Sequence, residues 1–101
     1  MEYVINQQDS TRRIVMSGQF TFSDNQKFKQ VLALLDDSQM KALVVDFTEV
    51  DFIDSAGLGM LLLLRDECQA RNIAISIAAA KGQVEKIFLI SKFDQLFSMV
   101  S

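Results

Sequence analysis

Hydrophobic and polar residues alternate in the first part of the chain. Residues 12–17 follow a period of two, which is typical of a strand, and residues 3–7 are compatible with another. The turn-forming residues 8–11 lie between them, so the pattern predicts an opening hairpin. We expect Gly18 to end the second strand and residues 20–22 to form a loop.

The spacing of apolar residues then changes to a helical period. One face of the predicted helix carries Phe28, Val31, Leu32 and Leu35. Ser23 or Asp24 can cap its first turn, because a side-chain oxygen there accepts a bond from a free backbone amide. The pattern fades over residues 36–38, where we expect the helix to end.

Strand and helix patterns continue to alternate to the end of the chain. Residues 41–47 contain the continuous apolar run Ala42–Val45, which suits a strand buried on both faces. The later segments are a loop over 48–54, a helix over 55–70, a strand over 73–78, a helix that begins after Lys81 and Gly82, and a short terminal element over 93–100. This order predicts a single α/β domain, residues 1–101, with helices packed on a mixed sheet.

Composition excludes several classes of function. A net charge of -3 argues against a nucleic-acid partner, and the absence of histidine excludes Ser-His-Asp and Cys-His catalysis and histidine-ligated metal sites. Cys68 is the single cysteine and cannot form an internal disulfide, so we expect it to be a packing residue. The longest apolar run, residues 56–64, is shorter than the roughly 20 residues of a bilayer span. We therefore expect a cytoplasmic protein that does not insert into membranes.

The segment Asp54–Gly59, with the sequence Asp-Ser-Ala-Gly-Leu-Gly, is the most informative one for function. It lies where an acidic loop meets the start of a helix, so Asp54 or Ser55 can cap the first turn. One interpretation is that Ser55 only caps the helix and the glycines only allow close packing. The other is that Ser55 presents an exposed hydroxyl that can be phosphorylated.

Phosphorylation at Ser55 would act electrostatically. It adds about -1.5 to -2 charges at a helix N-terminus, where an anion is tolerated, so the domain need not unfold. Glu49, Asp51 and Asp54 lie nearby in the sequence and would form an acidic patch with the phosphate. A partner that fits the neutral hydroxyl would then be repelled.

The helix that follows Ser55 has more apolar residues than one face can hold. Leu61, Leu64 and Cys68 can face the sheet together. Met60 and Leu63 are then candidates for an exposed partner-binding patch beside Ser55. The alternative is a helix that is buried all round at its N-terminal end.

The sequence resembles the STAS domain family of bacterial anti-sigma factor antagonists. The resemblance rests on three segments and Gly18: Leu43–Phe47, Val50–Gly59 with the long helix after it, and Phe93–Phe97. It implies a small mixed sheet of about four to five strands with helices mainly on one face. It also implies that the protein is the substrate of a serine kinase and a serine phosphatase, without being an enzyme itself.

The resemblance further implies a partner and a binding surface. The partner is an anti-sigma factor, often a serine kinase, which binds the unphosphorylated antagonist and is released when Ser55 is phosphorylated. The predicted partner-binding residues are Asp54, Ser55, Gly57 and Leu58, with Thr21, Phe22 and Asp24 from the loop after Gly18; the helix pattern described above adds Met60. Many members of the family have an acidic residue where this sequence has Thr21. We expect no cofactor and no metal, and a monomer or weak dimer.

Two other functions compete with this one. STAS proteins also serve as regulatory subunits of lipid-transport ATPase complexes, where threonine often replaces the motif serine; Ser55 leans against that assignment. The second competing function is that of an enzyme that binds magnesium through Asp51 and Asp54. Aspartates in a solvated loop are more often turn formers, and no third ligand is evident in the sequence.

Overall fold

The computed structural model describes residues 1–100 and shows a mixed sheet with the strand order β1-β2-β3-β4-β5. The strands are β1 (Glu2–Gln8), β2 (Thr11–Phe20), β3 (Ala42–Ile53), β4 (Ala74–Ala78) and β5 (Ser98–Val100). The helices are α1 (Asn25–Ala33), α2 (Ser55–Ala70) and α3 (Gly82–Ile90), with short 3-10 turns at Phe22–Asp24, Leu34–Asp36 and Phe93–Gln95. β1 and β2 are antiparallel and the other pairs are parallel. The predicted α/β fold and opening hairpin are confirmed.

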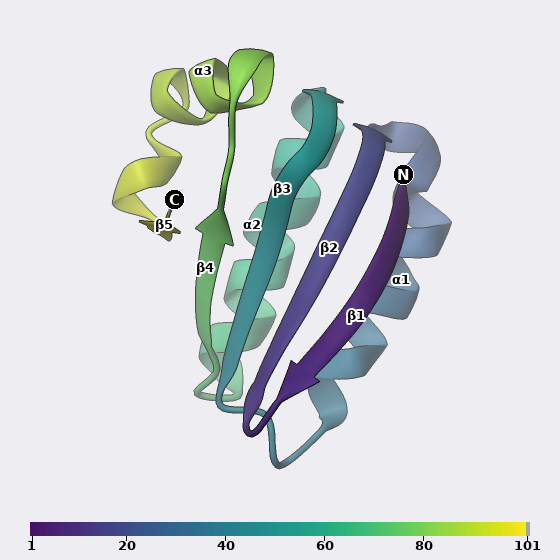
Figure 1. Cartoon of the computed structure of the whole chain (residues 1–101), viewed down its shortest axis with the longest axis vertical. Helices are drawn as coiled ribbons and strands as arrows, with labels where there is room; N and C mark the ends of the chain where they lie inside the picture. Colours follow the sequence, from purple (N-terminus) through teal and green to yellow (C-terminus); the bar gives the residue numbers. More distant parts are fainter. Residues whose placement is uncertain (101) are drawn as a thin grey trace.

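The sheet is covered by helices on one face. α1 and α2 lie side by side behind it, and α3 lies at the end toward which β3 and β4 run (Figure 1). The core fills the space between these layers and includes Ile14, Val31, Leu43, Val45, Phe47, Leu61, Leu64 and Ile77. Leu61, Leu64 and Cys68 face the sheet together as predicted. No helix within residues 1–100 is long and apolar enough to cross a membrane.

β2 and β3 are both longer than the sequence indicates. Gly18 does not end β2, because the strand continues to Phe20, and the predicted loop over residues 48–54 is mostly strand. The pairing shifts register between Val15 and Ser17 and again between Gly18 and Gln19. Each shift places an extra residue in β3, which breaks the simple alternation of buried and exposed positions. Gly18 has a φ of +84°, a conformation that glycine adopts without strain.

The terminal element contains a short turn and a fifth strand. Phe97 is buried, whereas Leu96 remains 39% exposed. The Phe88 and Phe93 rings stack with their centroids 5.4 Å apart, and Phe97 lies 5.3 Å from Phe93. These aromatic contacts hold the turn against α3 and bring β5 beside β4.

Cys68 is fully buried, and burial raises the pKa of its thiol to about 11. Because the thiolate is the reactive form, we expect Cys68 to react with an aromatic disulfide reagent at pH 8 roughly a hundredfold more slowly than an exposed thiol. The control is Ser38→Cys in a Cys68→Ala background, because Ser38 is exposed. Equal rates for the two proteins would contradict this prediction, and denaturant should remove the difference.

Candidate functional site

Ser55 is the first residue of α2, and its side chain is exposed. The helix is capped by Asp54, whose Oδ1 accepts a hydrogen bond from the Gly57 amide at 2.8 Å. The capping role thus falls to Asp54, and the Ser55 hydroxyl is not needed for it. The first-turn amides of Ser55 and Ala56 lie at the positive end of the helix dipole, where an anion is stabilised.

Asp54 also connects the helix to the loop after β2. Its second carboxylate oxygen, Oδ2, accepts a bond from the Phe22 amide at 3.2 Å, and its own amide donates to the Phe20 carbonyl at 3.3 Å. Gly57 packs against the same carbonyl, so closely that a Cβ there would lie 2.6 Å from it. One carboxylate therefore fixes both the helix start and the adjoining loop.

Two phenylalanines on these elements point to solvent. Phe22 is 71% exposed in the loop, and Phe52 is 40% exposed near the end of β3. Val50 and Ile53 are both buried, so the bulge at Asp51 turns Phe52 away from the core. We call Phe22, Asp51, Phe52 and Ser55 the Ser55 surface. Phe52 falls within the predicted loop over residues 48–54, where no pattern in the sequence marks it as an exposed aromatic residue of the site.

The end of β3 is held by a residue from a distant part of the chain. The Gln83 side chain accepts a bond from the Ile53 amide and donates to the Ile53 carbonyl, both at 3.2 Å. The side-chain amide bonds to the backbone of β3 well beyond Asp46, the last residue that pairs with β4. Gln83 therefore helps to position Asp54 and Ser55. No signal in the sequence indicates this contact, because the two residues are 30 positions apart.

The structure brings together most of the loop and helix residues predicted for partner binding, but Asp24 turns inward. Its side chain accepts a bond from the Thr21 amide at 2.9 Å and pairs with the amino group of Met1. Burial raises the pKa of Asp24, but these hydrogen bonds outweigh burial and lower it below its usual value. Asp24 therefore closes the loop and does not extend the acidic surface, which corrects the prediction. Thr21 is half-buried.

The predicted patch on α2 is also different. Met60 is 8% exposed and joins the core, so its placement in a partner-binding patch is wrong. Leu63, the other residue of the predicted patch, is 46% exposed as expected, and Leu62 is exposed beside it. Leu58 is half-buried, and Gly57 is buried beneath the loop after β2. The helical period places Met60 on the same side as Leu64, which faces the sheet.

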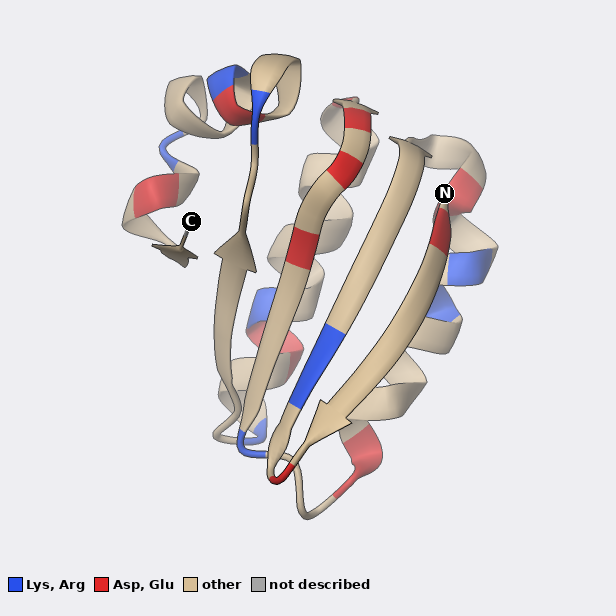
Figure 2. Cartoon of the chain, in the orientation of Figure 1, with Lys and Arg blue, Asp and Glu red and all other residues tan. Residues whose placement is uncertain are grey.

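Acidic residues dominate β3 on the approach to Ser55. Asp46, Glu49 and Asp51 follow one another along the strand (Figure 2). Glu49 and Asp51 are exposed, whereas Asp46 is buried and paired with Arg13. Within residues 1–100, no group of three or more acidic or cysteine side chains is arranged to hold a metal ion. The Ser55 surface and the adjoining part of β3 therefore present an exposed hydroxyl, two aromatic rings and negative charge.

The fold and this site define a small two-layer α/β domain with a mixed sheet and an exposed serine at a helix start. The model of the STAS domain family matches residues 2–101, so the chain belongs to the STAS domain family. A relative, the STAS-domain containing protein PA14_20770 of Pseudomonas aeruginosa strain UCBPP-PA14, is 38% identical over 86 residues, or 85% of this chain and 84% of the relative.

Solved structures show the same fold at low sequence identity. An anti-sigma factor antagonist from Mycobacterium paratuberculosis matches with a TM-score of 0.86 and 20% identity, over 98% of this chain and 84% of the other. The phosphorylated form of the Bacillus cell fate determinant SpoIIAA matches with a TM-score of 0.74 and 15% identity, over 99% of this chain and 92% of the other. A sulfate transporter family protein from Wolinella succinogenes and the STAS domain of a SulP transporter from Vibrio cholerae also have this fold.

Proposed function

We propose that this protein is an anti-sigma factor antagonist whose partner binding is switched off by phosphorylation of Ser55. The partner is an anti-sigma factor with serine kinase activity, a serine phosphatase reverses the modification, and the protein itself is a cytoplasmic regulator without enzyme activity. The observation that supports this best is the exposed Ser55 hydroxyl on a helix already capped by Asp54. A kinase can modify it without removing the cap.

The Ser55 surface has the features of a binding surface with aromatic anchors. Phe22 and Phe52 are large and exposed, and aromatic residues of this kind carry much of the binding energy in protein interfaces. Asp51 and Glu49 supply negative charge beside them. We expect the partner to have apolar pockets for the two rings and a basic residue for the carboxylates.

Phosphorylation would change the charge of this surface more than its shape. A phosphate on Ser55 adds about -1.5 to -2 charges next to the Asp54 carboxylate, while the helix dipole stabilises it locally. The partner loses contact with a neutral hydroxyl and faces a desolvated dianion. The structure of Bacillus SpoIIAA in its phosphorylated form has the same fold, which supports the view that this fold tolerates the modification.

A comparison of Ser55→Ala with Ser55→Asp tests the proposal. We expect an affinity pull-down with the alanine variant to retain an ATP-binding anti-sigma factor, and the purified partner to bind the aspartate variant and the phosphorylated protein at least roughly tenfold more weakly. Ser38→Asp is the matched control, since it adds the same charge at an exposed serine between α1 and β3. It should bind like the unmodified protein.

Two outcomes would count against the proposal. If Ser55→Ala and the phosphorylated protein bound the partner with equal affinity, phosphorylation of Ser55 would not control partner binding. Retention of a transport ATPase in place of an anti-sigma factor would favour the regulatory subunit of a lipid-transport complex. Thermal melting of each variant separates a binding defect from a folding defect.

A further inference from the structure

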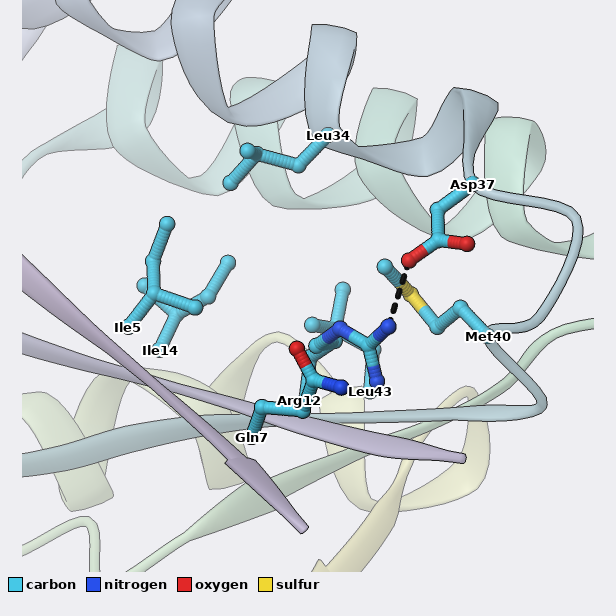
Figure 3. A pocket seen from close by; sticks show the side chains of 8 residues that line it. All are labelled: Ile5, Gln7, Arg12, Ile14, Leu34, Asp37, Met40 and Leu43. Atoms are coloured by element: carbon cyan, nitrogen blue, oxygen red, sulfur yellow. Dashed lines mark hydrogen bonds and ion pairs between the residues drawn. The ribbon is translucent and has the colours of Figure 1, made fainter. Parts of the chain in front are cut away.

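A cavity of about 330 Å³ lies between the sheet and the C-terminal end of α1. It adjoins the start of β3, whereas Ser55 follows the end of that strand, so the two sites are about 30 Å apart along the strand. Its walls are aliphatic and come from Ile5, Ile14, Leu34, Met40 and Leu43 (Figure 3). Ile14, Met40 and Leu43 are buried, whereas Ile5 and Leu34 are partly exposed.

The cavity lies between the edge strand β1 and the 3-10 turn that follows α1. α1 gives way to the 3-10 turn Leu34–Asp36, so Leu35 enters the core while Leu34 lines the cavity. β1 is an edge strand, and Ile5 remains 38% exposed there. No side chain of the described residues fills the space between Ile5 and Leu34.

One end of the cavity is polar but carries no net charge. The Arg12 side chain is only 10% exposed, and it donates to Asp37 and to the Asp9 carbonyl at 3.1 Å. The hydrogen bond from the Gln39 amide, followed by the Arg12 guanidinium, lowers the pKa of the Asp37 carboxyl, which is therefore ionised at neutral pH. A guanidinium has five N–H groups, so Arg12 retains donors beyond these two bonds. Gln7 adds an amide to this end.

We propose that this cavity binds a small, uncharged aliphatic molecule whose carbonyl group accepts a hydrogen bond from Arg12. The volume lies at the lower end of the range for ligand pockets, which fits a small molecule. A carboxylate would be repelled by Asp37, and an ammonium group by Arg12. The lining contains no aromatic ring on which a nucleobase or other planar ligand could stack.

Three probes with the same eight-carbon chain test the head-group preference. Octanamide, octanoate and octylammonium are titrated into the ¹⁵N-labelled protein while amide chemical shifts are recorded. We expect saturable shifts for octanamide at the cavity residues, and at least tenfold weaker binding of the two charged probes. Absence of saturation for octanamide up to about 10 mM, or saturation only at residues away from the cavity, would overturn the proposal.

Removing the negative charge of Asp37 supplies a sharper test. Asp37→Asn keeps the Oδ1 acceptor for the Gln39 amide but leaves Arg12 with an uncompensated charge. We expect octanoate to gain at least tenfold in affinity and to overtake octanamide. An unchanged order of the three probes would overturn the assignment of Arg12 as the donor. Because Asp37 is 36% exposed, this substitution leaves the core intact.

Filling the cavity should remove binding. Ile5→Trp places a large side chain at its mouth, and we expect at least a tenfold loss of octanamide affinity. Leu62→Trp is the matched control on α2, because Leu62 and Ile5 are equally exposed at 38%. Leu34→Phe replaces Ile5→Trp if the latter melts at a much lower temperature. Unchanged octanamide binding in a folded cavity variant would contradict the proposed location.

Discussion

Gly57→Ala is expected to lower the free energy of unfolding by about 3 kcal/mol, at the upper end of the usual range for overpacking. The added Cβ would lie 2.6 Å from the Phe20 carbonyl oxygen and 2.7 Å from Cγ1 of Ile53, both too close for a real contact. The clash displaces the carbonyl that also accepts the Asp54 amide. Urea unfolding at pH 7 measures the loss, and the melting temperature should fall by roughly 15 °C.

Gly59→Ala is the matched control because the two glycines share the first turns of α2. A Cβ at Gly59 meets nothing within 4 Å, and alanine is the better helix former. We expect this variant to be about 0.5–1 kcal/mol more stable than the unmodified protein. If Gly57→Ala proved as stable as Gly59→Ala, the close approach of α2 to the loop after β2 would be wrong.

Elements with a strong local pattern could be predicted from the sequence. α2 spans Ser55–Ala70 as expected, since its apolar residues repeat with a helical period after a residue suited to capping. Part of the candidate site follows from the same local chemistry, because Asp54 caps the helix within its own segment. The choice between Asp54 and Ser55 as the cap needed the structure.

Features that depend on long-range pairing could not be predicted. The exposure of Phe52 is set by a bulge, because the pairing of β3 with β2 shifts by one residue at Asp51. Gln83 reaches Ile53 from a different element, and β5 is a three-residue strand that forms beside β4. The sequence of β5 is too short to show a hydrophobic period. The aromatic anchors of the Ser55 surface were therefore only partly visible in the sequence.

The apolar β3 segment Leu43–Phe47 contains one buried acidic residue, Asp46. Asp46 is 8% exposed, and each of its carboxylate oxygens accepts two hydrogen bonds. Oδ2 accepts from Nε and Nη2 of Arg13, at 3.0 and 2.8 Å, while Oδ1 accepts from the amide and hydroxyl of Thr48, at 2.8 and 2.6 Å. The network joins β2 to β3 on the face of the sheet that α1 and α2 leave uncovered.

Asp46→Asn is expected to lower the free energy of unfolding by about 2–3 kcal/mol at pH 7, because one oxygen becomes an N–H group that faces other donors. Arg13→Met should cost less, about 1 kcal/mol, since Asp46 keeps its bonds to Thr48 and Arg13 is 42% exposed. Urea unfolding of both variants and of the double variant gives the coupling between the two side chains. A loss for Asp46→Asn no larger than that for Arg13→Met would contradict the four-bond network.

The effect of Asp46→Asn should also depend on pH. Burial raises the pKa of Asp46, but the bonds from Thr48 and Arg13 outweigh burial and lower it below the usual aspartate value. A carboxyl whose folded pKa is lowered stabilises the fold above its unfolded pKa of about 4, and this stabilisation is lost as the pH falls through the folded pKa. The stability difference between the protein and Asp46→Asn should therefore stay constant from pH 7 to 5 and shrink below about pH 4. Asp24 and Asp37 titrate in both proteins and cancel in the difference, so a constant difference down to about pH 3 would mean that Asp46 is not stabilised as a carboxylate.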